Sequence, residues 1–388
     1  MEALLVVGLL VAVFVGFNIG GSSTGVAFGP AVGSGIVTKL GAAGLMTGFA
    51  LLGGWTVGRN VIETMGGDIV PRSMFTLEAS VVVLFFVGFA LLISNTYGVP
   101  ASTSMTAVGA IAGLGVASNS LDWAVMGRIV IWWLVAPVAA FWVSAVIGRY
   151  FYPYLEARFG IDRSEGPLLT YDRTGPIPIP HLHESTTRRE LGSAILVVAI
   201  ASYMAFSAGA SNTANAVAPL VGSGELAIGH GVLLAGAAIG IGAFTIARRT
   251  LDTVGNDLTA LPLLAALIVE VVAASLITFL SALGIPASLA VSATMSIVGL
   301  GWGRATRTVT VTDAVRRQGE AKVSVDALAS EQPAEVSPIG EEDAADLTAA
   351  DLFDPATTGR VVVLWVLTPT LAALGAYALF ALVPLYAW

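Results

Sequence analysis

SSTGVAFGPAVGSG, residues 22–35, occurs a second time as SNTANAVAPLVGSG, residues 211–224, at a distance of 189 positions. Eight of the fourteen aligned positions are identical, including Pro30/Pro219 and the closing Gly-Ser-Gly. The similarity continues at the same offset, since RNVIETMGGDIV (59–70) aligns with RRTLDTVGNDLT (248–259). The chain is therefore a duplication, and each half carries one copy of the motif.

A second pair of motifs lies downstream of the first pair. GVPASTSMTAVGAIAGLG begins at Gly98 and GIPASLAVSATMSIVGLG begins at Gly284, at an offset of 186. Two paired signatures in the same order make chance similarity improbable. The duplication therefore covers most of both halves.

The composition is that of a membrane protein. Of the 388 residues, 56% are hydrophobic and 11% are charged, whereas a soluble domain has about 25% charged residues. Apolar runs of about 20 residues, enough to cross roughly 30 Å of hydrocarbon, recur along the chain. Only helices or closed barrels satisfy their backbone in lipid, and these runs are too continuous for a barrel. We therefore expect an all-α, polytopic helical bundle.

We predict ten crossings, five in each half. They are 2–20, 39–58, 75–96, 100–118 and 122–148, then 190–209, 227–246, 260–283, 286–302 and 360–386. The motif segments 22–38 and 211–226 are short and rich in Gly and Ser, so we expect them to be two re-entrant segments. The predicted domains are an N-terminal membrane repeat (1–148), a linker (149–190) and a C-terminal membrane repeat (191–388) with an acidic loop (303–358).

An odd number of crossings in each half inverts the second half relative to the first. Placing the linker in the cytoplasm then puts fifteen of the eighteen basic residues inside, as the positive-inside rule requires. Inverted repeats with Gly/Pro-broken segments at matching places are typical of secondary transporters, whose sites lie at the repeat interface. The prediction is a multi-pass protein of the plasma membrane with both termini outside.

The acidic loop suggests a source. Residues 303–358 hold eleven acidic and five basic residues, and the whole chain has two lysines. Surface carboxylates suit a protein in high salt, which screens their repulsion, so we expect a halophilic prokaryote. The alternative is an acidic, disordered loop.

Several classes of function are disfavoured. The chain has no cysteine, which excludes disulfides and thiolate metal sites. No His, Cys or Lys lies deep in a predicted crossing, so we expect neither an enzyme nor a metal site. We expect no cofactor beyond a coupling Na⁺ or H⁺, no nucleic-acid partner, a lipid surrounding and a possible homodimer.

Small polar side chains gather at the predicted helix breaks and are the candidate substrate site. Hydroxyl groups, amides and helix N-termini can all donate to an anion. The alternative is that these residues only pack helices together. The candidates are Ser22, Ser23, Thr24, Ser102, Thr103, Ser104, Ser211, Asn212, Thr213, Asn215 and Ser288.

Together the two motif pairs resemble the inorganic phosphate transporter (PiT) family. That family has an Asn-Asp-x-Ala-Asn type signature in each half and a Gly-x-Pro-x-Ser-Thr-Thr signature downstream. The resemblance implies uptake of phosphate by alternating access, coupled to Na⁺ or H⁺. The alternatives are a sulfate permease of the same family and an anion channel, which would show conductance and no coupling.

The chain departs from the family pattern at the motif carboxylates. The family's aspartate falls on Ser23 in the first half and on Asn212 in the second, and one of its asparagines falls on Val26. A site without these carboxylates has no acceptor for the proton of monobasic phosphate, which favours fully ionised sulfate as the alternative substrate.

Three residues are candidates for the coupling ion. Glu270 lies within a predicted crossing, where an ionisable residue is a functional candidate, at a position where the family commonly has a glutamate. A buried structural acid is the alternative. Asn18 and Asn95 flank the first-half breaks and could offer carbonyl oxygens to a cation.

Overall fold

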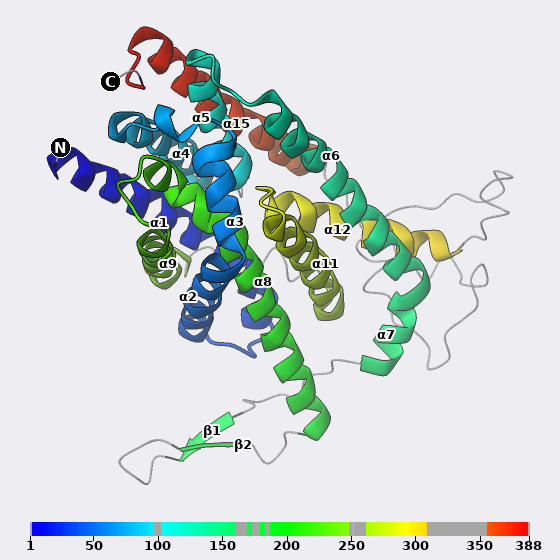
Figure 1. Ribbon diagram of the computed structural model, residues 1–388. Coiled ribbons are helices and arrows are strands. Elements are labelled where there is room, and N and C mark those ends of the chain that lie inside the picture. The colour runs from blue at the N-terminus through cyan, green and yellow to red at the C-terminus, as the bar shows by residue number, and fades with distance from the viewer. Residues whose placement is uncertain are drawn as a thin grey trace, which may run out of the picture.

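The computed structural model describes residues 2–96, 102–159, 169–172, 179–182, 187–247, 251, 261–308 and 355–386. The first half contains α1 (Glu2–Gly33), α2 (Lys39–Thr56), α3 (Gly58–Glu63), η1 (Thr64–Asp68), η2 (Arg72–Met74), α4 (Leu77–Thr96), α5 (Thr103–Ala117), α6 (Trp123–Val146), η3 (Ile147–Phe151) and α7 (Tyr152–Phe159). The second half contains α8 (Arg188–Gly222), α9 (Ile228–Thr245), α11 (Leu263–Ala282), α12 (Leu289–Ala305), η5 (Thr306–Thr308) and α15 (Pro355–Leu382). Figure 1 shows them as one helical bundle.

The predicted all-α membrane fold is confirmed. Within the described residues, seven helices are long and apolar enough to cross a membrane, or up to eight if a bent pair counts as one span. That pair joins α2 to α3 and η1 at an angle of 64°. Each of the ten predicted crossings contains a helix, although α5 and α12 span only 15 and 17 residues.

The structure repeats with the sequence. α2 and α9 begin and end 189 positions apart, and α1 and α8 end at the same offset. α4 and α11 begin and end 186 positions apart. The offsets of the two motif pairs therefore hold for whole helices.

Glycines bring equivalent helices to the same close distance in both halves. A methyl group on Gly20 of α1 would lie 2.0 Å from the carbonyl oxygen of Ile239 in α9. A methyl group on Gly209 of α8 would lie 2.0 Å from the carbonyl oxygen of Ala50 in α2. Gly20 and Gly209 are 189 positions apart, as are Ala50 and Ile239. Each half thus packs its first helix against the second helix of the other half, as small residues allow in membranes.

The last membrane-crossing helix of each half, α6 or α15, also packs against a helix of the other half. α5 packs against α15, where a methyl group on Gly113 would lie 2.4 Å from the carbonyl oxygen of Ala373. α12 packs against α6, where a methyl group on Gly299 would lie 2.1 Å from the carbonyl oxygen of Phe141. The two repeats are therefore interlocked.

The predicted re-entrant segments are wrong for both motifs. Residues 22–33 continue α1, and residues 211–222 continue α8, each without a break. The small polar side chains support the helix, since Thr24 Oγ1 donates to the Gly20 carbonyl and Thr213 Oγ1 to the Gly209 carbonyl, both at 2.7 Å. Glycine and serine persist in a membrane helix when neighbouring helices cover them.

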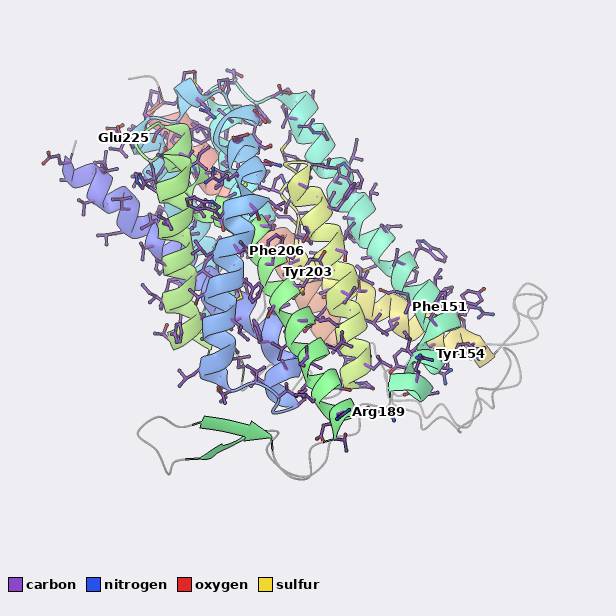
Figure 2. The ribbon with its side chains drawn as sticks, turned by 60° about the horizontal axis from the view of Figure 1, so that its bottom comes forward. Phe151, Tyr154, Arg189, Tyr203, Phe206 and Glu225 are labelled. Atoms are coloured by element: carbon purple, nitrogen blue, oxygen red, sulfur yellow. The ribbon has the colours of Figure 1, made fainter. Side chains whose placement is uncertain are left out.

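The two halves run in opposite directions. In Figure 1 the marked ends N and C lie on one side of the bundle, and α7 and the start of α8 lie on the other. We call these sides the terminus face and the linker face. Figure 2 labels Arg189, near the first residue of α8, on the linker face, and Glu225, just past its end, on the terminus face. α1 runs the other way, as the predicted inversion requires.

The helix before the linker is longer than predicted. η3 and α7 extend it beyond residue 148 to Phe159. Two short strands follow, β1 (Leu169–Asp172) and β2 (Ile179–Leu182), which pair antiparallel with Leu169 opposite Leu182. The predicted acidic loop lies outside the described residues from 309 to 354.

Candidate anion site

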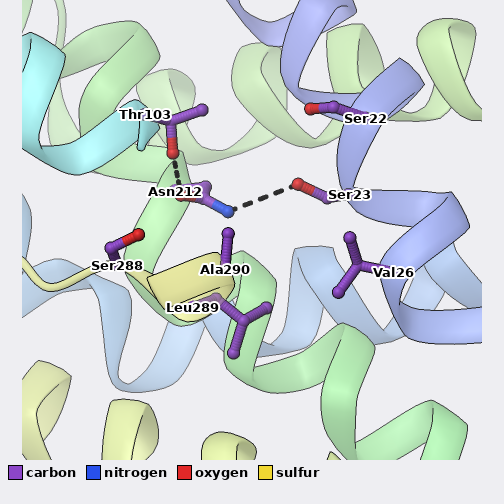
Figure 3. Close-up of a pocket in the computed structure, with 8 residues that line it drawn as sticks. All are labelled: Ser22, Ser23, Val26, Thr103, Asn212, Ser288, Leu289 and Ala290. Atoms are coloured by element: carbon purple, nitrogen blue, oxygen red, sulfur yellow. Dashed lines mark hydrogen bonds between the residues drawn. The ribbon is translucent and has the colours of Figure 1, made fainter. Parts of the chain in front are cut away.

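A small cavity lies where the two repeats meet. Its volume is about 30 Å³. Figure 3 shows its lining side chains, which are Ser22, Ser23, Val26, Thr103, Asn212, Ser288, Leu289 and Ala290. These residues come from α1, α8 and the starts of α5 and α12, so both motif pairs contribute to one site.

Equivalent residues face each other across this cavity. The Asn212 amide nitrogen lies 3.5 Å from Ser23 Oγ, and the two residues are 189 positions apart. Thr103 and Leu289 are the first residues of the equivalent helices α5 and α12. The cavity therefore lies at the interface between the two symmetry-related halves, which is where secondary transporters bind their substrates.

A hydrogen-bond network holds the polar wall. Thr103 Oγ1 donates to Asn212 Oδ1 at 2.6 Å, and the Asn215 amide nitrogen lies 3.1 Å from the same oxygen. Asn215 also donates to Ser104 Oγ at 3.2 Å. Ser104 Oγ lies 3.2 Å from Ser211 Oγ, which donates to the Ala287 carbonyl. Ser104, Ser211 and Asn215 therefore position Thr103 and Asn212 from behind.

Two helix N-termini point at this region. α5 begins at Thr103 after Ser102, and α12 begins at Leu289 after Ser288. Ser288 caps its helix by accepting from the Val291 amide at 3.3 Å. Ser102 makes no such cap, and its hydroxyl is buried without a hydrogen-bond partner. The positive ends of both helix dipoles and the uncapped first turn of α5 favour an anion.

The break before α12 is held from two sides. Trp133 Nε1 of α6 donates to the Pro286 carbonyl at 2.8 Å. The Asn60 amide of α3 donates to the Ala282 carbonyl, also at 2.8 Å. These bonds satisfy carbonyls that a broken helix leaves free and fix the start of α12 against the cavity.

Some predicted site residues lie elsewhere. Thr24 and Thr213 bond to their own helices, and Thr213 packs against Gly54 of α2, where an added methyl group would lie 2.4 Å from its Oγ1. Ser22 lines the cavity, but its hydroxyl bonds to the Asn18 and Ile19 carbonyls. Sequence reasoning missed Leu289 and Ala290, which line the cavity beside Val26, because apolar lining residues carry no chemical signature.

The coupling candidates separate into two places. Asn95 donates to Asn18 Oδ1 at 3.0 Å, joining α4 to α1. Glu270 of α11 instead lines a second cavity of about 220 Å³, which shares Val26 and Ala290 with the first. Glu270 is 4% exposed, and neither carboxylate oxygen has a hydrogen-bond partner. Only the two asparagines therefore form one cluster.

Comparison with known proteins agrees with this geometry. The model of the phosphate transporter family matches residues 19–376. The chain belongs to the phosphate transporter family. It is 31% identical over 297 residues to the sulfate permease CysP of Bacillus subtilis, covering 76% of this chain and 77% of the permease. It is 22% identical over 375 residues to a putative phosphate permease of Pyrococcus furiosus, covering 79% and 89% of the two chains.

A solved structure has the same fold. The chain aligns with a sodium-dependent phosphate transporter over 99% of both chains, with a TM-score of 0.67 and 18% identity. At this identity the likeness concerns the fold alone. The match to the family model confirms the family resemblance inferred from the motif pairs.

Proposed function

We propose that this member of the phosphate transporter family is a secondary active transporter that moves an inorganic tetrahedral oxyanion by alternating access, coupled to a Na⁺ or H⁺ gradient. The observation that carries the proposal is the cavity between the repeats. Hydroxyl and amide groups and two helix N-termini surround it, and none of the described residues that line it is charged. Neutral donors bind an oxyanion through directed hydrogen bonds, and a site without fixed cations can release it.

The hydrogen-bond acceptors around the cavity favour sulfate over phosphate as the substrate. Asn212 Oδ1 already accepts a hydrogen bond from Thr103 and lies within bonding distance of the Asn215 amide. The described residues that line the cavity include no carboxylate, so the hydroxyl group of monobasic phosphate would lack a strong acceptor. An unpaired donor inside a site costs affinity. The 31% identity to a sulfate permease supports the same choice.

Phosphate remains the second candidate. The family model and the named Pyrococcus relative support it. The hydroxyl groups of Ser23 and Thr103 can reorient to accept as well as donate, which would accommodate a substrate hydroxyl group. The two anions differ chiefly in that one proton, so competition between them is informative.

We propose Glu270 as the residue that binds the coupling ion. Among the described residues that line the 220 Å³ cavity, it is the only one with a titratable side chain. The shared residues Val26 and Ala290 place that cavity directly beside the anion site. The Asn18–Asn95 pair is the second candidate, since amide oxygens can bind Na⁺.

The exposed apolar surface indicates how the protein lies in the membrane. Large apolar side chains are exposed on α6 and α15, such as Leu134 at 69% and Val366 at 63%. We propose that these faces contact lipid in the plasma membrane, with the linker face in the cytoplasm. The homodimer and the halophilic source stay predictions.

Uptake into proteoliposomes tests the function. Purified protein should accumulate radiolabelled sulfate, and phosphate less well, under an imposed Na⁺ or H⁺ gradient. Empty liposomes are the control. No uptake of either anion under either gradient would refute the transporter, and uptake that ignores both gradients would indicate a channel.

A further inference from the structure

The 220 Å³ cavity extends from the anion site toward the linker face. In the part of the chain that the structure describes, it is lined by eleven residues: Val26, Pro30, Met204, Leu261, Ala266, Val269, Glu270, Ala290, Ala293, Thr294 and Ile297. From the anion site it follows α1 toward Pro30 and α12 toward Ile297. α12 continues into η5, where Arg307 donates to the Arg149 carbonyl in η3 at 3.1 Å, next to α7 on the linker face.

The repeat gives every lining residue a counterpart. The offsets are 189 for the first two helices of each half and 186 for the motif pair that follows. The counterparts are Asn215, Pro219, Val15, Phe75, Ser80, Val83, Leu84, Ser104, Ala107, Val108 and Ile111. By the symmetry of the two halves, they correspond to a wall on the terminus side of the anion site.

The two walls differ in packing. All eleven counterparts are buried, and Ser80, Leu84 and Val108 are 0% exposed. Seven of the eleven residues around the open cavity are only half-buried, among them Pro30, Ala293 and Thr294. The cavity on the linker side is therefore open, whereas the matching residues on the terminus side are closely packed; we call them the collapsed wall.

Two hydrogen bonds close the collapsed wall. Ser80 Oγ of α4 donates to the Pro219 carbonyl of α8 at 2.8 Å. The Asn215 amide of α8 donates to Ser104 Oγ of α5 at 3.2 Å. Both link helices that line the same wall.

The open wall has no equivalent of either bond. Ala266 and Pro30 stand where Ser80 and Pro219 stand, and Val26 and Ala290 stand where Asn215 and Ser104 stand. None of these side chains can donate or accept a hydrogen bond. The closed linker-side wall would therefore be less stable than the closed terminus-side wall.

We infer that the structure is the state open toward the linker face, and that Ser80 is a gate residue on the opposite route. In the alternate state the Ser80–Pro219 and Asn215–Ser104 bonds break, the terminus-side wall opens, and the cavity beside Glu270 closes. The inference rests on the proposed function only in treating both cavities as one transport path. The missing bonds on the linker side bias the resting protein toward the observed state.

Single cysteines test this directly, because the natural chain has none. Ala293→Cys reports on the open cavity, and Ala107→Cys reports on the matching position of the collapsed wall. A water-soluble maleimide should label Ala293→Cys quickly and Ala107→Cys slowly in the purified protein. Adding Ser80→Ala should shift the equilibrium constant between the two states about fivefold toward the alternate state, the effect of one neutral hydrogen bond, so that labelling becomes faster at position 107 and slower at position 293.

The reverse substitution supplies a second arm. Ala266→Ser places a hydroxyl group opposite Pro30, where it can form the missing bond when the linker-side cavity closes. It should slow labelling at position 293 and speed labelling at position 107. This variant keeps the inference testable if Ser80→Ala does not fold.

Reciprocity decides the outcome. Faster labelling at position 107 without slower labelling at position 293 would mean local loosening and would overturn the inference, as would no change at either position. Labelling needs no substrate, so reciprocal labelling in a protein that takes up neither anion would reject the proposed function and leave the two-state gate standing.

Discussion

The amide nitrogen of Asn212 lies 3.5 Å from the hydroxyl oxygen of Ser23, and these two residues hold the same position in the two halves of the chain. One duplicated position therefore supplies two opposed donors to a single cavity. Because one copy is an amide and the other a hydroxyl group, each can be tested separately.

Removing either donor should weaken anion binding. Ser23→Ala or Asn212→Ala deletes one hydrogen bond to the anion, and we expect about a five- to tenfold rise in Kd from a loss of about 1 kcal/mol each. Titration calorimetry with sulfate measures it. Thr24→Val is the matched control, because the Thr24 hydroxyl bonds to its own helix. Equal effects of Ser23→Ala and Thr24→Val would contradict the assigned site.

A carboxylate at position 212 should separate the two anions. Asn212→Asp adds a negative charge beside the substrate, and we expect sulfate affinity to fall at least tenfold through repulsion. Monobasic phosphate carries a hydroxyl group that can donate to the new carboxylate, so its affinity should fall less. Competition for radiolabelled uptake provides the measurement. An equal loss of affinity for both anions would contradict the argument that the hydrogen-bond acceptors of the site select the substrate.

Neutralising Glu270 should uncouple transport. Glu270→Gln keeps the shape of the side chain but cannot exchange a proton or attract a cation. Gradient-driven uptake should fall at least tenfold, while exchange of anion across the membrane continues. Glu78→Gln is the control, since Glu78 is exposed at the start of α4. If gradient-driven uptake survives in Glu270→Gln, coupling resides elsewhere, with the Asn18–Asn95 pair as the next candidate.

The glycine contacts between halves should be intolerant of side chains. Gly209→Leu would force α8 away from α2, because even a methyl group would lie 2.0 Å from the Ala50 carbonyl oxygen. We expect destabilisation of about 3 kcal/mol, the upper range for overpacking, seen as a lower Tm in detergent. Gly192→Leu on the same helix has open space around it and should leave Tm nearly unchanged. Similar Tm values for the two variants would argue against this helix contact.

The helices and their duplication were predictable, because hydrophobic length and motif spacing report on them directly. The continuity of α1 and α8 was not. A Gly- and Ser-rich stretch looks broken in isolation, yet Gly20 packs against α9 and the Thr24 hydroxyl bonds within the helix. Contacts with distant helices decide the outcome, and a single sequence does not display them.

The anion site was predictable in part. Ser22, Ser23, Thr103, Asn212 and Ser288 line the cavity, whereas Thr24 and Thr213 do not. A neighbouring residue on a helix points about 100° away, so a prediction of two re-entrant segments could not tell the facing side chains from their neighbours. The open and collapsed walls were also beyond sequence reasoning, because the same residues build both states.

The exchanged helices bear on how the protein is made. α5 ends at Ala117 and packs against α15, which begins at Pro355, 238 residues further along the chain (355 − 117). At a synthesis rate of about 5–20 residues per second, α5 waits for its neighbour for roughly ten seconds or longer. During that time its apolar surface, including the glycine face at Gly113, must be shielded by lipid or by the insertion machinery. Truncation before α15 should therefore leave the first half without its final packing and expose it to quality control.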